Sequence, residues 1–348
     1  MSSKGQTKLF KIIAKLHLGH RFWCLKAEEG SPLLGTMFAT YLHDLSPKII
    51  QFTETIGIQW YGLAYVTGFY LTYLVMRFLA RRGLSQIAEK DVGDFITGVA
   101  LFGVILGGRL GYMLLYNFDE FIQRPWVFLM LHQGGMASHG GIAGVALYCL
   151  WYARKHRICW TGIGDTLVCG APLGIFLGRI ANFINGELFG RVTTVPWAMK
   201  FPTELLHEDF VKQGGELPPM PDYLQHSPDI IAWFEQHRGG RPELEAILHP
   251  RHPSQLYEAF GEGLLLTLVL LWIRVKWPKM PHGIISGLFF ILYAVVRIAL
   301  EGVRQPDSGS SMIMGLTKGQ FFSTFMIVAG LAFILIGWLR REKAGSER

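Results

Sequence analysis

The chain has 348 residues, of which 50% are hydrophobic and only 17% are charged, whereas ordinary globular proteins carry about 25% charged residues. This shortage of charge argues against a soluble protein, and the composition shows no repeat, sustained heptad or charge excess typical of fibrous, coiled-coil or disordered chains. A net charge of +7 comes without an aromatic-basic RNA motif or a zinc spacing, so no nucleic acid is expected as a partner. Basic loops facing anionic membrane lipid explain the charge more simply.

The N-terminal region, residues 1–58, is interpreted as an extension that precedes the first span. Within residues 1–26, Lys and Arg alternate with apolar residues at helical spacing, which indicates an amphipathic basic helix on a membrane surface. A cleaved signal peptide is not indicated, because no apolar core ending in small residues follows. The side of the membrane on which this helix lies stays open.

Seven mostly apolar blocks follow, and a membrane helix needs about 20 such residues. The third block is the shortest. The sequence therefore predicts an all-α polytopic membrane protein with a membrane domain at 59–340 and a cytoplasmic tail at 341–348. The predicted spans are 59–79, 95–116, 139–154, 163–185, 256–273, 283–301 and 320–339.

Lys and Arg are concentrated after the first, third, fifth and seventh blocks, whereas residues 117–138 contain only Arg124. Because cytoplasmic loops are enriched in Lys and Arg, we expect the first span to start outside and the C-terminus to be cytoplasmic. The polar stretch 186–255 is too long for an ordinary connection and is rich in turn formers. It is interpreted as a small module on the outer face, with a soluble accessory domain as the alternative.

Several ionisable residues fall inside the predicted spans, where each costs at least about 2.5 kcal/mol on insertion scales. They are therefore candidates for function, although mutual neutralisation that fixes helices together is the alternative, above all for Arg109. The residues are Arg109, Arg179, Glu258, Glu262, Arg297 and Glu301.

Arg179 and Arg297 lie on different predicted helices and could clamp a phosphate, because the planar guanidinium matches phosphate oxygens. At that depth the phosphate of a lipid head group is the most accessible one. His139 lies between glycines at the start of the third span and is either a functional neighbour or a satisfied polar residue. These residues alone indicate a membrane enzyme or carrier for an anionic phospholipid, without separating the two.

Seven motifs occur along the chain in one order between about residues 58 and 340, and together they resemble the bacterial prolipoprotein diacylglyceryl transferases. Any one of them alone would be a weak signal. The motifs are IQWYGLAY, FGVILGGRLGYMLLYN, QGGMASHGGIAG, GRIANFINGELFGR, HPSQLYEAFGEG, YAVVRIALEGVRQPD and TKGQFFS.

The resemblance implies an inner-membrane, multi-pass enzyme that uses membrane lipid as a substrate. It would transfer the diacylglyceryl group from phosphatidylglycerol to the thiol of the lipobox cysteine in a prolipoprotein signal peptide, forming a thioether and releasing glycerol phosphate. The resemblance implies no cofactor and no metal. The alternative is a non-catalytic protein of the same fold that binds or transports anionic phospholipid.

The resemblance also implies residue roles. His139, Arg179 and Arg297 would be catalytic: a base such as His139, or the arginines, would raise the thiolate fraction, and the arginines would stabilise the leaving phosphate. Glu187 and Glu301 would hold the arginines in place. The residues expected to bind substrate are Tyr61, Asn182, Glu187, Gly190, Tyr293, Glu301 and Arg304.

Overall fold

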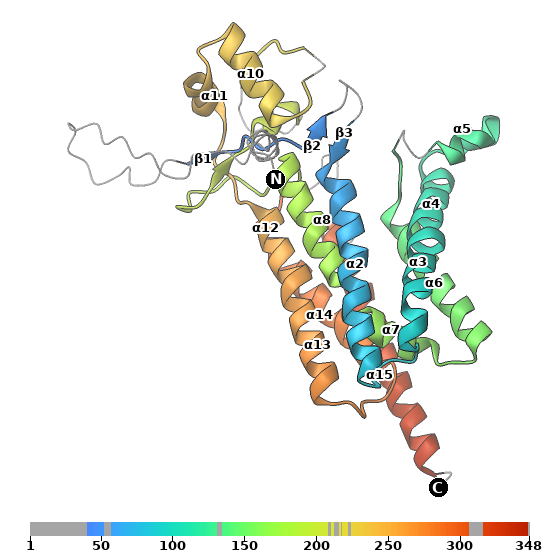
Figure 1. The fold of residues 1–348 in the computed structure, drawn as a ribbon. Helices are drawn as coiled ribbons and strands as arrows, with labels where there is room; N and C mark the ends of the chain where they lie inside the picture. Colours follow the sequence, from blue (N-terminus) through green and yellow to red (C-terminus); the bar gives the residue numbers. More distant parts are fainter. Residues whose placement is uncertain are drawn as a thin grey trace, which may run out of the picture.

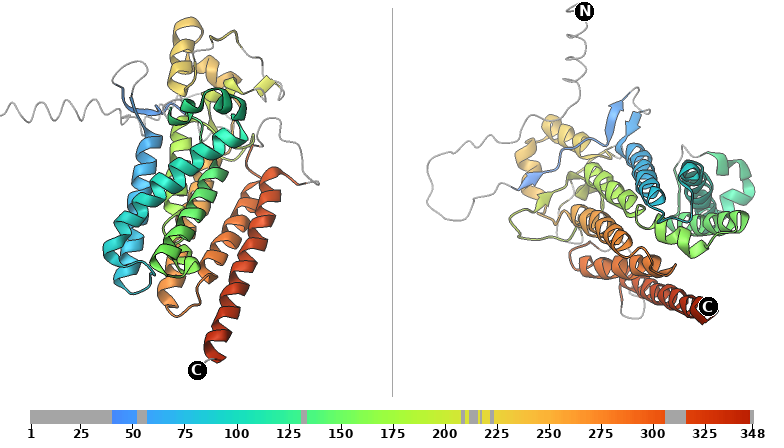
Figure 2. Two further views of the ribbon diagram at one scale, coloured as in Figure 1. Left: turned by 90° about the vertical axis from the view of Figure 1, so that its right-hand side faces the viewer. Right: turned by 60° about the horizontal axis from the view of Figure 1, so that its bottom comes forward.

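The computed structural model describes residues 40–51, 57–130, 134–207, 210–211, 216, 218–221, 224–305 and 316–346. Long helices run side by side, and a smaller group of short helices and strands covers one end of them (Figures 1 and 2). The amphipathic helix predicted within residues 1–26 lies outside the described residues.

Every one of the seven predicted apolar blocks is helical. Two blocks are divided into consecutive helical segments because the helix changes to wider π-helical turns, for eight residues in η2 and seven in η6. The segments are α2 (Trp60–Arg81), η1 (Glu89–Asp91), α3 (Val92–Gly98), η2 (Val99–Leu106), α4 (Gly107–Leu115), α6 (Ser138–His156), α7 (Trp160–Leu167), α8 (Pro172–Asn185), α12 (Ser254–Glu258), η6 (Ala259–Leu265), α13 (Leu266–Lys276), α14 (Ile284–Leu300) and α15 (Lys318–Ser346).

Four helices in the described residues are long and apolar enough to cross a membrane: Trp60–Arg81, Glu89–Leu115, Ser254–Lys276 and Gly319–Arg340. Helices α7 and α8 meet at 42°, and they make a fifth span if the bent pair crosses as one. Helix α14 is apolar but shorter. The structure therefore confirms a mainly helical membrane protein, while the count of seven spans stays a prediction.

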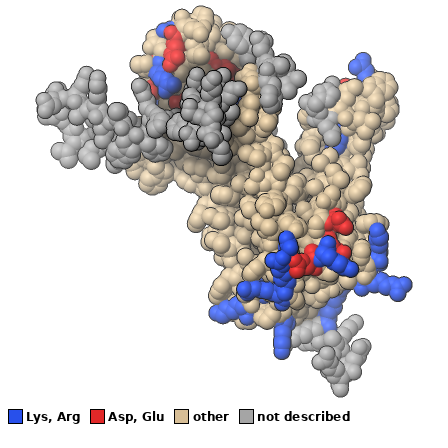
Figure 3. Space-filling view, viewed as in Figure 1, with Lys and Arg blue, Asp and Glu red and all other residues tan. Residues whose placement is uncertain are grey.

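On the face shown in Figure 3, the charged residues are concentrated at the two ends of the helical bundle, as is typical of a membrane protein. On this face, Lys and Arg gather at the end of the bundle that is remote from the group of short helices and strands, and a broad uncharged zone separates the two ends. The residues at that end include Arg81 in the last turn of α2, Arg154 and Lys155 in the last turn of α6, and Lys276 in the last turn of α13.

Glycines bring α6 against η2 and α4 so closely that their backbones touch. A Cβ at Gly111 would lie 2.6 Å from the Cα of Gly140, and one at Gly144 would lie 2.9 Å from the Cα of Gly107. Small residues at such spacing allow close approach of membrane helices. This packing fixes the start of α6, where His139 lies, relative to α4.

A small module within residues 186–255, predicted to lie on the outer face, contains several short elements and has a hydrophobic core of its own. Its core includes Leu205, Phe210, Ile230 and Phe234, all at most 2% exposed. The elements are η5 (Pro202–Leu206), α10 (Ser227–His237), α11 (Arg241–Ile247) and strand β4 (Met199–Lys200). On the other side of Figure 1, α5 (Phe118–Gln123) and η3 (Pro125–Leu129) follow α4.

The prediction of an all-α fold omitted four short strands. Strand β1 (Tyr41–Leu42) pairs in parallel with β4, and β2 (Lys48–Gln51) pairs antiparallel with β3 (Gly57–Gln59). Next to β1, the Nδ1 atom of the buried His43 lies 2.9 Å from the Ser227 hydroxyl. Residues 41–44 are thus joined to this module.

Candidate functional site

The site begins at the C-terminal end of α8, where the chain turns sharply. Gly186, with φ of 70°, ends the helix in the left-handed conformation that glycine adopts without steric cost. Leu188 also has a positive φ of 56°, a strained conformation that is uncommon outside glycine and clusters at functional sites. Ser254 and Gln255 hold this loop, since they donate to the carbonyls of Leu188 and Glu187 at 3.0 and 2.7 Å.

Tyr61, Asn182 and Glu187 form a polar group between α2 and α8. The Asn182 amide donates to the Glu187 carboxylate at 2.9 Å, and the Tyr61 hydroxyl donates to the same oxygen. The Asn182 amide also donates to the Tyr61 hydroxyl. One carboxylate therefore orients a phenol and an amide, both of which can bond to hydroxyl groups of a ligand.

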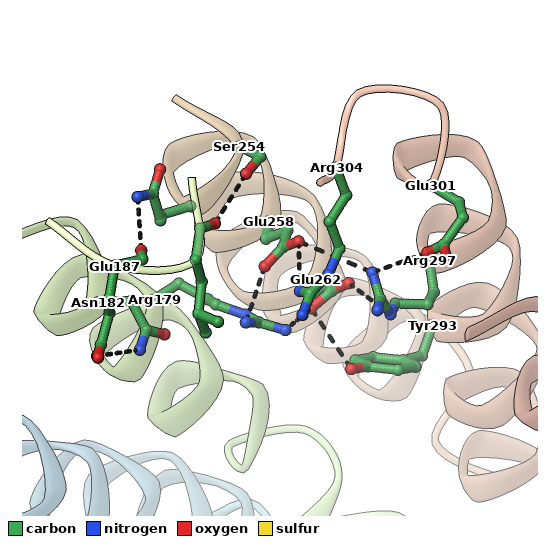
Figure 4. Close-up of polar contacts among 12 residues, drawn as sticks. Arg179, Asn182, Glu187, Ser254, Glu258, Glu262, Tyr293, Arg297, Glu301 and Arg304 are labelled. Carbon is green, nitrogen blue, oxygen red and sulfur yellow. Dashed lines mark hydrogen bonds and ion pairs between the residues drawn. The ribbon is translucent and has the colours of Figure 1, made fainter. Parts of the chain in front are cut away.

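A second and larger group lies one turn earlier on α8. Arg179 contacts two carboxylates on the neighbouring helix: its Nη1 lies 2.8 Å from Glu258 Oε2, and its Nη2 lies 3.3 Å from Glu262 Oε2 (Figure 4). Glu258 and Glu262 are four residues apart in a segment that passes from α12 into η6, and both side chains are fully buried. The guanidinium fork of Arg179 thus spans the pair.

Helix α14 brings further residues to the same two carboxylates. Arg297 lies 3.7 Å from Glu258 and 3.9 Å from Glu262, and it pairs with Glu301 one turn later at 3.4 Å. Just beyond the helix, Arg304 donates to Glu258 at 2.9 Å. The Tyr293 hydroxyl, also on α14, donates to Glu262 at 3.4 Å.

The close approach of α8 to η6 depends on glycine. A Cβ on Gly263 would lie 2.6 Å from the Cα of Phe176, so a larger residue would separate the two helices and the charges they carry. Glu262 lies in the π-helical turns of η6, and such turns occur frequently at functional sites.

The arginines and carboxylates of this cluster balance in charge, and they differ in exposure. Arg179, Arg297 and Arg304 face three acids, Glu258, Glu262 and Glu301. The arginine side chains are 12–17% exposed, whereas Glu258 and Glu262 are 0% exposed. An anion that approaches the cluster therefore meets guanidinium groups before it meets Glu258 and Glu262, although Glu301 is 11% exposed.

Gly190 joins the α8 loop to the end of α14. Its N–H donates to the His252 carbonyl at 2.8 Å, and it forms an isolated bridge with Arg304. A Cβ here would collide with the Val303 carbonyl and would lie 2.7 Å from the Cβ of His252. Only glycine fits between these strands of backbone.

The described partners of His139 and Arg109 are residues outside the arginine cluster. His139 is exposed in the first turn of α6, and its ring lies 5.7 Å from that of Phe322 on α15. Arg109 is buried and donates to carbonyls of the loop after α5, including those of Phe128 at 3.1 Å and Gly135 at 3.0 Å. Within the described residues, Arg109 thus bonds to backbone carbonyls of this loop, and not to an acidic partner as the neutralisation alternative expected.

Eight of the ten predicted site residues lie in these two groups, which share α8. Gly190 joins the loop after α8 to Arg304, and the described ring contact of His139 is with Phe322. Glu187 differs from expectation, because its described contacts are with Tyr61 and Asn182 rather than with an arginine. Glu258 and Glu262, which the sequence marked as candidates for function or as neutralising acids, are the main partners of the arginines. Their spacing of four residues beside glycines was the available signal.

The fold and the site define a helical membrane protein with a cluster of arginines and glutamates beside a polar group. The family model described as prolipoprotein diacylglyceryl transferase matches residues 47–336. The chain belongs to this family.

Among its relatives is the phosphatidylglycerol–prolipoprotein diacylglyceryl transferase of Bdellovibrio bacteriovorus, which is 37% identical over 86% of this chain and 94% of its own length. Proteins of the same name from Nitrobacter hamburgensis and Neisseria gonorrhoeae are 40% and 37% identical. These two alignments cover 83% and 86% of this chain and 87% and 99% of the relatives.

Proposed function

We propose that this protein transfers the diacylglyceryl group of phosphatidylglycerol to the lipobox cysteine thiol of prolipoproteins in the bacterial inner membrane. The names of its relatives support the two substrates. The observation that carries the proposal is the convergence of Arg179 and Arg297, from two different helices, on one pair of carboxylates.

Two arginines that share acidic partners can also share a phosphate. A guanidinium binds phosphate oxygens through two parallel hydrogen bonds, and a phosphate in place of the carboxylates would lie within reach of Arg179 and Arg297 together. The leaving group of the reaction is a phosphate monoester, whose charge grows as the bond to the lipid breaks. Preorganised donors at such a position typically contribute about 10²–10³ in rate.

The head-group glycerol needs different partners. Tyr61 and Asn182, oriented by Glu187, offer a hydroxyl and an amide that suit the head-group hydroxyls. Because Asn182 and Arg179 are both on α8, the glycerol would lie one turn along the helix from the phosphate. Gly190 and Arg304 would close the outer end of this site.

The thiol must lose its proton for the transfer to proceed, since the thiolate is the nucleophile and a free cysteine has a pKa of about 8.5. The sulfur–carbon bond forms as the carbon–oxygen bond to phosphate breaks, and the electron pair of that bond leaves with glycerol phosphate. His139 is one candidate to accept the thiol proton. The alternative is that the field of the arginines lowers the pKa of the bound thiol.

We propose the following arrangement in the membrane. The seven helical blocks are seven spans, with the outer module formed by residues 186–255, the start of the first span outside, and the C-terminus in the cytoplasm. The gathering of Lys and Arg at the end remote from that module (Figure 3) supports this orientation. Residues 1–58 would form the extension and 341–348 the tail.

The proposal can be tested in bacteria depleted of their own diacylglyceryl transferase. This chain should restore growth and convert accumulated prolipoprotein to the lipid-modified form, whereas the Arg297→Ala variant should not, although it enters the membrane. Accumulation of unmodified prolipoprotein with the native chain inserted would contradict the proposal. Phosphatidylglycerol binding without conversion would favour the non-catalytic lipid carrier instead.

A further inference from the structure

The arginine cluster is already neutralised by acids, and this affects how it can receive a lipid phosphate. Glu258 and Glu262 each contact both Arg179 and Arg297. A phosphate brought to these arginines would lie against two buried carboxylates. Like charges so close in a buried site repel strongly, so one carboxylate must move away or take up a proton.

The two acids are not held equally. Glu258 has close contacts with Arg179 at 2.8 Å and Arg304 at 2.9 Å. Glu262 has longer contacts, 3.3 Å to Arg179 and 3.9 Å to Arg297. Glu258 therefore keeps a close arginine when a phosphate binds Arg179 and Arg297, whereas Glu262 loses both of its ion-pair partners.

We propose that Glu262 yields Arg179 and Arg297 to the phosphate of phosphatidylglycerol and takes up a proton as it does so. This inference rests on the proposed function and adds a proton to the lipid-binding step. Once neutral, Glu262 no longer repels the phosphate, and its carboxyl group can stay buried at much lower cost than a carboxylate without a partner. Glu262 acts here as a positioning residue that controls the arginines.

Among the ionisable groups around the phosphate position, Glu262 is the one that can accept a proton when the lipid binds. Arg179 faces it from α8, and Arg297 and Tyr293 face it from α14. Arginine does not lose its proton in proteins, and the phenol of Tyr293 already donates toward Glu262. Glu258 faces it from one turn earlier and remains paired with Arg304.

The test is a calorimetric titration of the purified full-length protein with short-chain phosphatidylglycerol, in two buffers that differ in ionisation enthalpy. Native protein should take up about one proton per bound lipid, and its affinity should fall about tenfold per pH unit above neutrality. Diacylglycerol, which lacks the phosphate, should show neither effect. This measurement needs no variant, so it does not depend on the folding of a mutant.

A variant then assigns the proton to one residue. Glu262→Gln should bind phosphatidylglycerol at least tenfold more tightly at pH 8, without proton uptake and with an affinity independent of pH. Glu243→Gln is the matched control, because Glu243 pairs with Arg238 in the outer module and should behave as native protein. Proton uptake that persists in Glu262→Gln, or weaker binding by that variant, would overturn the assignment.

The two proposals fail in different ways. If native protein catalyses transfer and binds the lipid with no proton uptake between pH 6 and 8.5, the role of Glu262 is wrong and the function stands. If proton-linked binding is found without any transfer to a lipobox peptide, the function is wrong and Glu262 still controls a phospholipid site.

Discussion

The Arg179 guanidinium and the Glu258 carboxylate form a 2.8 Å ion pair between α8 and α12, in which the acid is fully buried and the base is 17% exposed. Such a pair contributes little net stability, but removal of one partner leaves a buried charge. Its geometry therefore serves to hold a cation at an accessible position. The same holds for Arg304, which contacts Glu258 at 2.9 Å and is 12% exposed.

Arg179→Lys should lower kcat/KM for transfer by at least about 100-fold, because an ammonium is a point charge and cannot form the two-pronged contact of a guanidinium. Arg238→Lys, in the exposed pair with Glu243, is the matched control and should keep native activity. The measurement is the steady-state rate of transfer to a lipobox peptide. A near-native rate for Arg179→Lys would mean that the contact is only coulombic.

Arg297→Ala should abolish measurable transfer while the protein stays folded in the membrane. Glu258 and Glu262 keep Arg179 as a partner in this variant, so neither acid is left without a cation. Activity, together with gel filtration and circular dichroism in detergent, checks both parts of this prediction. Full activity would exclude Arg297 from phosphate binding, and loss of the folded protein would show that its role is structural.

Gly190→Ala should inactivate the protein, because the added Cβ would collide with the Val303 carbonyl and with His252. The displaced backbone carries Arg304 away from Glu258. Gly62→Ala is the matched control, since nothing lies within 4 Å of a Cβ at Gly62. Transfer assays on both variants test this, and an active Gly190→Ala protein would show that the loop can move aside without cost.

The outer module should lose stability in acid. Burial lowers the pKa of His43 from 6.5 to about 4, so the unfolded state binds more protons than the folded state between these values. Stability from this group is complete above pH 6.5 and falls as the pH falls toward 4, by about 2 kcal/mol at pH 5.

Thermal unfolding followed by the fluorescence of Trp233, which lies in the core of the module, measures this effect at pH 7.5 and 5. His43→Gln should reduce the difference between the two pH values, because glutamine does not titrate. An equal pH dependence in native protein and variant would assign the effect to another group.

The sequence predicted the helices well because each apolar block is long and clearly bounded by charge. It did not predict the strands, because segments of two to four residues leave little local pattern. Strand β1 also depends on a partner far along the chain, β4, whereas β2 pairs with the nearby β3. Likewise, the break between α7 and α8 lies inside one continuous apolar block. Hydropathy alone could not place that bend.

Most residues of the site were predicted from the sequence, but the contacts between them were not. Arg179 and Arg297 were recognisable because charged residues are costly in a membrane, and Arg297 with Glu301 because they are four residues apart on one helix. The partners of Arg179 lie 79 and 83 residues away on another helix, and a single sequence does not reveal such a pairing. Glu187 was expected to hold an arginine, but its side-chain partners are Tyr61 and Asn182. The sequence did not reveal these contacts either.

The proposed function requires that the arginine cluster receives phosphatidylglycerol for transfer to a thiol. The most direct measurement mixes the purified protein in detergent with phosphatidylglycerol and a lipobox peptide, and follows thioether formation and glycerol phosphate release together. Thioether and glycerol phosphate should form in equal amounts, and neither should form with a peptide in which serine replaces the cysteine. Release of glycerol phosphate without the peptide thiol, or no product from protein that binds the lipid, would contradict the proposed function.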